Sequence, residues 1–202
     1  MRIGLYFGTY NPIHVGHLII ANYMVNYTEL DQVWLVVSPQ NPLKRKASLL
    51  EDYHRLALVR IAVEGNTKLK ASNIEFDLPK PSYSIDTLVY IQERHPKHSF
   101  SLIMGEDNLR TFHKWKNYEQ ILENNIIYVY PRVLTETERI EGQADISSQA
   151  FENHPNITMC NAPVMKISAS FIRKAIKEKK DVQYLLSEPV FNYVTEMHFY
   201  EK

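Results

Sequence analysis

The amino-acid sequence predicts an α/β protein with a Rossmann-like fold, in which helices flank a doubly wound, mostly parallel β-sheet. Short apolar runs rich in β-branched and aromatic residues alternate along the chain with amphipathic helical segments. Most of these runs end at glycine, serine or proline, the residues that usually form turns. This alternation is typical of a parallel sheet whose strands are connected by helices on both faces.

The first half of the chain supplies three predicted strands and three predicted helices. The strands are expected at residues 3–7, at residues 33–37 and within residues 69–76. The helices are expected from Gly16 onward, over residues 49–63 and over residues 84–94. In these segments the apolar residues recur at a spacing that places them on one helix face, which can then pack on the sheet.

The second half continues the alternation and then ends in helices. The expected strands are residues 100–104, 126–130 and 157–159, and the expected helices are residues 117–123, 170–179 and 188–197. Residues 135–148 are polar and acid-rich without periodicity, which predicts a surface loop. We therefore expect a single domain over residues 1–202, with a Rossmann-like core over residues 1–165 and a small helical segment over residues 166–202.

The charge balance and the cysteine content narrow the classes of function. Lys plus Arg and Asp plus Glu number 23 each, so the formal net charge is zero, whereas nucleic-acid-coating and membrane-surface proteins carry a basic excess. No segment approaches the roughly 20 apolar residues that span a bilayer. Asn11, Pro12 and His14 interrupt the apolar run of a signal peptide, and the single Cys160 cannot form an intrachain disulfide. We expect a cytoplasmic protein that binds neither nucleic acid nor membrane; homo-oligomer formation is left open.

The turn between the first strand and the first helix, residues 8–17, is the most informative stretch. In open α/β sheets, ligands bind beyond the carboxyl ends of the strands. Gly8 allows a ligand to approach the backbone, and backbone N–H groups at a helix N-terminus attract phosphate. His14 and His17 are three residues apart, so both imidazoles can contact one ligand. Beside a polyphosphate they would be protonated and would donate charge-assisted hydrogen bonds.

Three other interpretations of this stretch are weaker. A histidine near a helix start, considered alone, is most often a capping or surface residue. A zinc pair would need further ligands, and the chain has one cysteine. A dinucleotide-binding turn would show the pattern G-x-G-x-x-G after the first strand, and this chain lacks it there.

A second candidate phosphate-binding segment, Ile-Ser-Ala-Ser-Phe-Ile-Arg at residues 167–173, precedes a predicted helix near the C-terminus. Serines at a helix start are most often N-caps, and Arg173 considered alone could be a solvated charge. A guanidinium group also matches phosphate oxygens in a bidentate arrangement. Two distant segments that both suit a phosphate ligand are stronger evidence for a phosphate site than either segment is alone.

The two segments resemble the two signatures of the nucleotidyltransferase superfamily, Gly-Ser/Thr-Phe-Asp/Asn-Pro leading into His-x-Gly-His, and Ile-Ser-Ser/Ala-Thr/Ser-x-Ile-Arg. The resemblance implies a nucleotidyltransferase domain in which an acceptor phosphate attacks the α-phosphate of a nucleoside triphosphate directly and pyrophosphate leaves. It implies that His17 contacts the α-phosphate, His14 orients ATP, and Arg173 holds the departing pyrophosphate. The further ATP-binding residues that it implies are Gly8, Thr9, Tyr10, Ile167, Ser168 and Ser170.

The middle of the chain is similar to the bacterial nicotinate-nucleotide adenylyltransferase family, in residues 38–44, 81–87 and 105–107 and at Trp115. This resemblance extends over nearly the whole chain. It implies an ATP-binding enzyme of NAD biosynthesis that transfers AMP from ATP to nicotinate mononucleotide, with Mg²⁺ bridging the ATP phosphates.

The family resemblance also implies roles for individual residues in the middle of the chain. Ser84 would contact the nicotinate carboxylate and Trp115 would stack on the pyridine ring. Gly105 and Asp107 would line the ribose and adenine of the nucleotide, and Lys44 would neutralise the acceptor phosphate in the catalytic step.

The chain departs from the common bacterial pattern at three positions, Phe7, Asn11 and Leu43. Asn11 also occurs in the nicotinamide-nucleotide branch of the superfamily, so nicotinamide mononucleotide remains an alternative acceptor, as does phosphopantetheine. A nucleotide-sensing module without catalysis is the alternative from another class of function.

Overall fold

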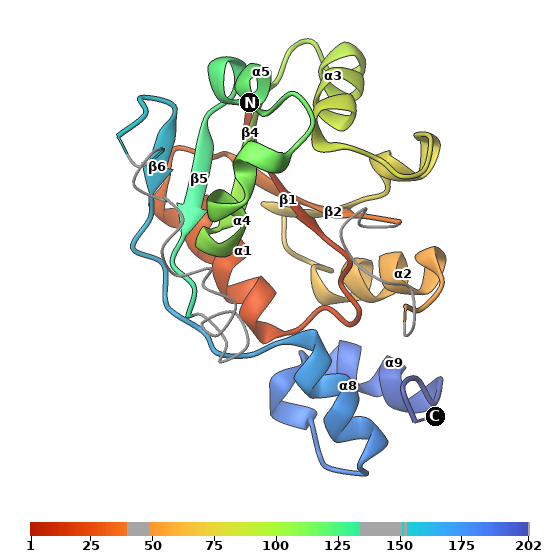
Figure 1. Ribbon diagram of the computed structural model, residues 1–202. Coiled ribbons are helices and arrows are strands. Elements are labelled where there is room, and N and C mark those ends of the chain that lie inside the picture. Colours follow the sequence, from red (N-terminus) through yellow and green to blue (C-terminus); the bar gives the residue numbers. More distant parts are fainter. Residues whose placement is uncertain (40–48, 134–150, 152, 202) are drawn as a thin grey trace.

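The computed structural model describes residues 1–39, 49–133, 151 and 153–201, and it confirms the predicted fold class. Figure 1 shows a twisted sheet with helices on both faces. The predicted loop at residues 135–148, together with Leu43 and Lys44, lies outside the described residues. No helix in the described parts of the chain has the length and apolar character needed to cross a membrane.

Within the described residues the sheet has six strands, and every strand pair in it is parallel. The strands are β1 (Arg2–Gly8), β2 (Gln32–Val37), β3 (Leu69–Ser72), β4 (Ser99–Gly105), β5 (Ile127–Tyr130) and β6 (Ile157–Met159). Their order in space is β3-β2-β1-β4-β5-β6, so the direction of winding reverses between β1 and β4. A doubly wound sheet of this order binds ligands where the winding reverses, beyond the carboxyl ends of the strands.

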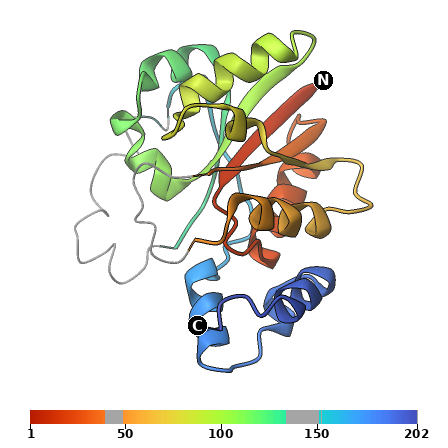
Figure 2. The same ribbon diagram turned by 90° about the vertical axis from the view of Figure 1, so that its right-hand side faces the viewer.

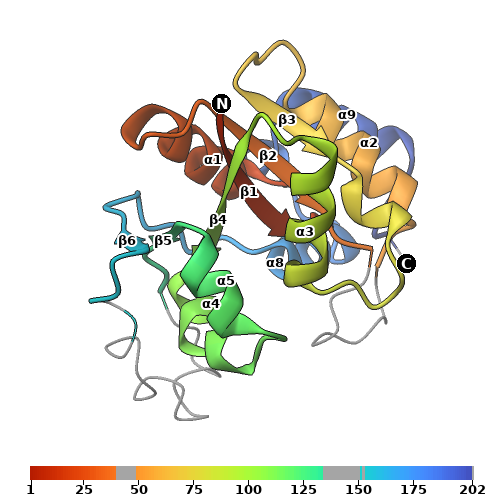
Figure 3. The same cartoon turned by 90° about the horizontal axis from the view of Figure 1, so that it is seen from above.

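The predicted helices are present and cover both faces of the sheet (Figure 3). They are α1 (Val15–Tyr27), α2 (Asp52–Ala62), α3 (Ser84–Arg94), α5 (Tyr118–Asn124), α8 (Ala169–Lys177) and α9 (Glu188–Glu196). Buried side chains of α1 and α2 pack on one face, and those of α3 and α5 pack on the other. Because β1 is covered on both sides, its successive residues enter opposite cores: Leu5 packs with α3 and α5, and Tyr6 packs with α1 and α2.

The structure adds short elements that periodicity does not reveal. These are α4 (Glu106–Arg110) and three 3₁₀ helices, at Ile74–Asp77, Phe112–Lys114 and Gln183–Leu185. The largest departure from a predicted helix boundary is at α2, which begins at Asp52 and not at residue 49. The Leu50 backbone is held outside the helix, because its N–H donates to the Asn11 side chain and its carbonyl accepts from the Arg55 guanidinium.

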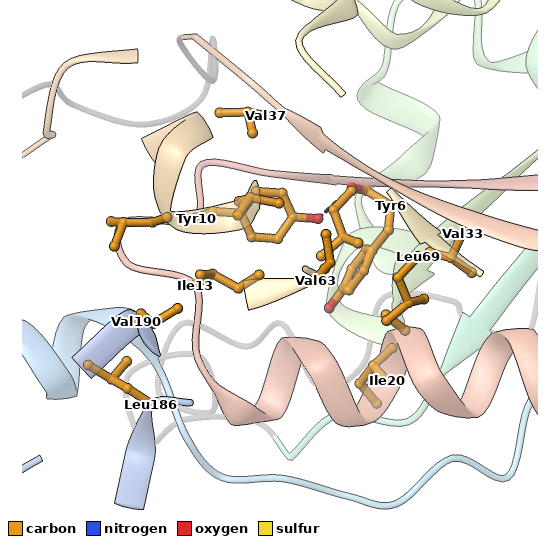
Figure 4. Close-up of a cluster of buried hydrophobic side chains, with 14 of the residues drawn as sticks. Tyr6, Tyr10, Ile13, Ile20, Val33, Val37, Val63, Leu69, Leu186 and Val190 are labelled. Atoms are coloured by element: carbon orange, nitrogen blue, oxygen red, sulfur yellow. Dashed lines mark hydrogen bonds between the residues drawn. The ribbon is translucent and has the colours of Figure 1, made fainter. Parts of the chain in front are cut away.

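The C-terminal helices are grouped at one end of the molecule, below α1 and α2 in Figure 1 and again together in Figure 2. Leu186 and Val190 belong to the same buried cluster as Ile13, the residue just before the histidine turn of His14 to His17. Figure 4 shows these three side chains close together. The second signature segment is therefore attached to the first through a shared core.

Candidate active site

Two cavities lined by described residues open at the carboxyl end of the sheet, where the winding reverses. The first has a volume of about 330 Å³ and lies along the histidine turn and the start of α8. The second has a volume of about 480 Å³ and lies along the ends of β1 and β4 and the start of α3. The end of β1 and the side chains of Asn108, Tyr130 and Arg132 line both cavities, so the cavities adjoin.

The histidine turn brings its two imidazoles together, as the spacing predicts. His14 is the N-cap of α1, and the His17 Nδ1 atom accepts a hydrogen bond from the His14 backbone N–H over 3.3 Å. The two rings are stacked with their centroids 3.8 Å apart. Tyr10, in a left-handed conformation at φ 45°, donates its hydroxyl hydrogen to the Tyr6 carbonyl (Figure 4). The Tyr10 ring packs edge-on against His17. Both histidines line the first cavity.

Burial determines the charge state of His14 in the ligand-free protein. Burial and the nearby positive charge of Arg132 lower the pKa of His14 from 6.5 to about 4. Among the described residues its Nδ1 atom is buried without a hydrogen-bond partner. In the ligand-free protein His14 is therefore neutral at neutral pH. The sequence analysis predicts protonation only beside a bound polyphosphate, and that stays a prediction. Protonation requires a negative charge that the ligand itself must bring.

The second signature segment joins the first cavity from the C-terminal side. Ser168 caps α8, because its hydroxyl oxygen accepts a hydrogen bond from the Phe171 N–H, so the ordinary capping interpretation is confirmed for it. Arg173 donates to the Asn11 carbonyl over 2.8 Å and to the Ser170 hydroxyl over 3.1 Å. Ile167, Ser168, Ser170 and Arg173 all line the first cavity together with the histidines.

Asn11 and Gly16 allow this close contact between the two segments. The Asn11 side-chain oxygen accepts a hydrogen bond from the Tyr200 hydroxyl over 2.9 Å, which ties the end of the chain to the turn. A Cβ atom on Gly16 would lie 2.6 Å from the Ile167 Cγ2 atom, so only glycine fits at this position without a shift of the neighbouring chain.

The second cavity contains the residues that the family resemblance assigns to the pyridine nucleotide. Ser84 is the first residue of α3, and Trp115 is half-buried with its ring edge-on to Phe112. Gly105 and Asp107 line this cavity and not the first one, although Asn108 beside them lines both.

Arg132, which the sequence analysis did not single out, faces both cavities. It forms an ion pair with Asp107 and lines both cavities. The signal that could have identified Arg132 is its position just past Pro131, at the carboxyl end of a predicted strand.

Arg55 was also missed, because a charged residue in an amphipathic helix is ordinarily taken to be solvated. It is fully buried and braces the loops that follow β1 and β2 by donating to the carbonyls of Thr9, Ser38 and Pro39. It also pairs with Asp52 over 2.5 Å. The lining of both cavities therefore depends on a buried cation.

The donor set of the first cavity suits phosphate oxygens. Imidazole, hydroxyl and guanidinium groups converge there, and all of them can donate hydrogen bonds. Across the described residues, no three His, Cys, Asp or Glu side chains form a group that could hold a metal ion.

Comparisons with known proteins agree with this chemistry. The cytidylyltransferase-like family model matches residues 5–175. A probable nicotinate-nucleotide adenylyltransferase of Flavobacterium johnsoniae is 55% identical over 202 residues, which is the whole of both chains. The corresponding proteins of Christiangramia forsetii and Bacteroides thetaiotaomicron are 54% and 40% identical, with 99% and 97% of this chain covered and 98% and 92% of theirs.

Solved structures with a similar fold include the nicotinic acid mononucleotide adenylyltransferase of Plasmodium falciparum complexed with NaAD, with a TM-score of 0.79. The match covers 99% of this chain and 97% of that one. At 20% sequence identity, this likeness supports the fold alone.

Proposed function

Because the chain belongs to the nicotinate-nucleotide adenylyltransferase family within the cytidylyltransferase-like proteins, we propose that it transfers AMP from ATP to nicotinate mononucleotide. The products are deamido-NAD and pyrophosphate, and the reaction is a step of NAD biosynthesis. The observation that carries the proposal is the pair of adjoining cavities, one lined by phosphate donors and the other by an aromatic ring and a helix start. Residues 1–202 would act together as one nucleotidyltransferase domain.

The first cavity is the proposed ATP site. His17 would donate to the α-phosphate and His14 would orient the triphosphate, while Ser168, Ser170 and Arg173 would hold the departing pyrophosphate. Adenylyl transfer asks little covalent chemistry of the protein, so positioning and charge stabilisation supply the catalysis. Holding the two substrates in line removes roughly 7–11 kcal/mol of the barrier, and each donor aimed at developing charge contributes about 2.7–4 kcal/mol.

The second cavity is the proposed acceptor site. Trp115 would stack on the pyridine ring, and the backbone amide of Ser84 would receive the ring carboxylate at the N-terminus of α3, where an anion is favoured. Lys114 also lines this cavity, and its positive charge would favour the acid over the amide. Lys116 lines the cavity too, but its ammonium group is paired with Asp86 over 3.0 Å. Lys44, outside the described residues, would neutralise the acceptor phosphate.

We propose Mg²⁺ as the divalent ion and ATP as the nucleotide. The ion would reach the site on the ATP phosphates and supply charge neutralisation there, with water completing its coordination. Gly8, Thr9 and Tyr10 would line the triphosphate. Gly105 and Asp107 would contact the ribose and adenine from the second cavity, next to Asn108, which lines both cavities. A cytoplasmic location fits these substrates and the single cysteine.

The deciding experiment compares pyrophosphate release from ATP and Mg²⁺ with nicotinate mononucleotide and with nicotinamide mononucleotide. We expect kcat/KM to be at least about tenfold higher for the acid, a difference of about 1.4 kcal/mol in transition-state binding. Equal values would contradict the choice of acceptor, and no release with either would contradict the enzyme assignment.

Two variants test the assigned residues. His17→Ala should lower kcat by at least about tenfold while the thermal melting curve keeps its shape, because a donor to the transferred group is lost. Trp115→Ala should raise KM for the pyridine nucleotide; if only KM for ATP rose, the stacking role would be wrong.

A further inference from the structure

Two tyrosine hydroxyls lie where the cavities adjoin, and neither sequence signature includes this pair. Tyr6 lies on β1 and Tyr130 is the last residue of β5, and each of them lines both cavities. The Tyr6 hydroxyl donates a hydrogen bond to the Tyr130 hydroxyl over 3.1 Å. The two rings pack edge to face with their centroids 5.9 Å apart.

The hydrogen bond between Tyr6 and Tyr130 uses only one of the two hydroxyl hydrogens. Two hydroxyls carry two hydrogens, and the contact between them uses one. Tyr6 is only 5% exposed and points its hydrogen at Tyr130, so the remaining hydrogen belongs to the more accessible Tyr130. Burial raises the pKa of both phenols, so both hydroxyls are protonated at neutral pH. Between described residues no hydrogen bond uses the Tyr130 hydrogen, and it is free to meet a ligand.

The position of the Tyr130 hydroxyl matches the place where the substrates must meet. A Cβ atom on Gly105, at the end of β4, would lie 3.2 Å from this hydroxyl. The Tyr130 hydroxyl therefore lies beside a residue that lines the second cavity. On the opposite side the Tyr6 ring meets the His17 imidazole edge to face, with centroids 6.2 Å apart. The Tyr130 hydroxyl therefore lies between the proposed ATP site and the proposed acceptor site. The α-phosphate is the part of ATP that must face the acceptor.

Resting on the proposed adenylyl transfer, we infer that the Tyr130 hydroxyl donates a hydrogen bond to an oxygen of the α-phosphoryl group as it is transferred. Tyr6 is the positioning residue, because its hydrogen occupies a lone pair of the Tyr130 oxygen and leaves the Tyr130 hydrogen directed into the site. A donor to an oxygen that gains negative charge contributes most in the transition state, so its loss lowers turnover more than binding.

Tyr130→Phe tests this role, since phenylalanine keeps the edge-to-face contact and removes only the hydroxyl. We expect kcat to fall about 10- to 100-fold, the range of one hydrogen bond to a charged group, with each KM changed less than about threefold. Tyr128→Phe is the matched control, because Tyr128 is buried two residues earlier on β5 and lines neither cavity. Its kcat should stay within about twofold of wild type.

Tyr6→Phe tests the positioning. We expect a smaller loss of kcat than in Tyr130→Phe, and a double variant no slower than Tyr130→Phe alone, because the Tyr6 hydroxyl acts through Tyr130. Losses that multiply in the double variant would overturn the positioning role. An unchanged kcat in Tyr130→Phe, or a raised KM for one substrate at unchanged kcat, would overturn the inference as a whole. An inactive wild type would instead contradict the adenylyltransferase assignment, so the two failures are distinguishable.

Discussion

Protonation of His14 should accompany ATP binding. In the ligand-free protein, burial and the charge of Arg132 lower the pKa of His14 to about 4, so at pH 7 the imidazole is neutral. One phosphate charge about 4 Å away contributes about 4 kcal/mol at the effective dielectric of a protein site. Because each pKa unit corresponds to about 1.36 kcal/mol, this charge alone raises the pKa by about 3 units, to near 7. ATP should therefore bring about half a proton or more into the site at pH 7.

Titration calorimetry measures this uptake directly. ATP and Mg²⁺ are titrated without acceptor at pH 7 in buffers of different ionisation enthalpy, and the dependence of the heat on the buffer gives the number of protons bound. His14→Gln removes the titrating group, while His113→Gln, at an exposed position, is the control. Proton uptake in wild type should exceed that in His14→Gln by about half a proton and should match that in His113→Gln. Equal uptake in wild type and His14→Gln would refute the reasoning, because ATP itself contributes equally to both.

Three further predictions follow from buried or closely packed residues. Arg55→Met should lower the free energy of unfolding by about 3–5 kcal/mol in urea titrations, because the buried hydrogen bonds of the guanidinium are lost; a loss under about 1 kcal/mol would contradict its bracing role. Gly16→Ala should raise KM for ATP but not for the acceptor, because the added methyl group displaces Ile167 from the first cavity; unchanged ATP kinetics would argue against that coupling. Burial raises the pKa of Glu75 above its ordinary value of 4.5. As the pH rises above 4.5, the unfolded state therefore releases this proton while the folded state keeps it, and the free energy of unfolding of the wild type falls. The melting temperature of Glu75→Gln relative to wild type should therefore increase from pH 5 to pH 8, and a constant difference would be inconsistent with the raised pKa.

The strands and the histidine turn could be predicted because their signals are local. A buried strand needs a short apolar run and a turn residue, and both lie within a few positions of each other. His14 and His17 converge because three residues separate them at a helix start, which depends on no distant part of the chain. The predicted start of α2 was wrong for the opposite reason, because Asn11, which is distant in the sequence, holds Leu50 outside the helix.

The charge state and the unassigned site residues depend on distant contacts. The neutral imidazole of His14 results from burial and from the approach of Arg132, and neither is visible in the residues around it. Tyr130 and Arg132 acquire their significance only because β5 lies beside β4, which is a consequence of strand order. The position just beyond a strand's carboxyl end is the one general signal that could have drawn attention to Arg132.

The attachment of the C-terminal helices to the histidine turn has a consequence for ATP binding. Arg173 donates to the Asn11 carbonyl, and Tyr200 donates to the Asn11 side-chain oxygen. The two segments of the phosphate site are therefore both anchored at Asn11. Arg173 donates to the Asn11 carbonyl through one nitrogen while it lines the first cavity, and its position toward a phosphate is therefore set by the turn itself. A triphosphate that contacts both segments therefore binds a set of donors that is already assembled. The free-energy cost of ordering the protein is smaller than it would be if residues 166–202 had to close over the nucleotide.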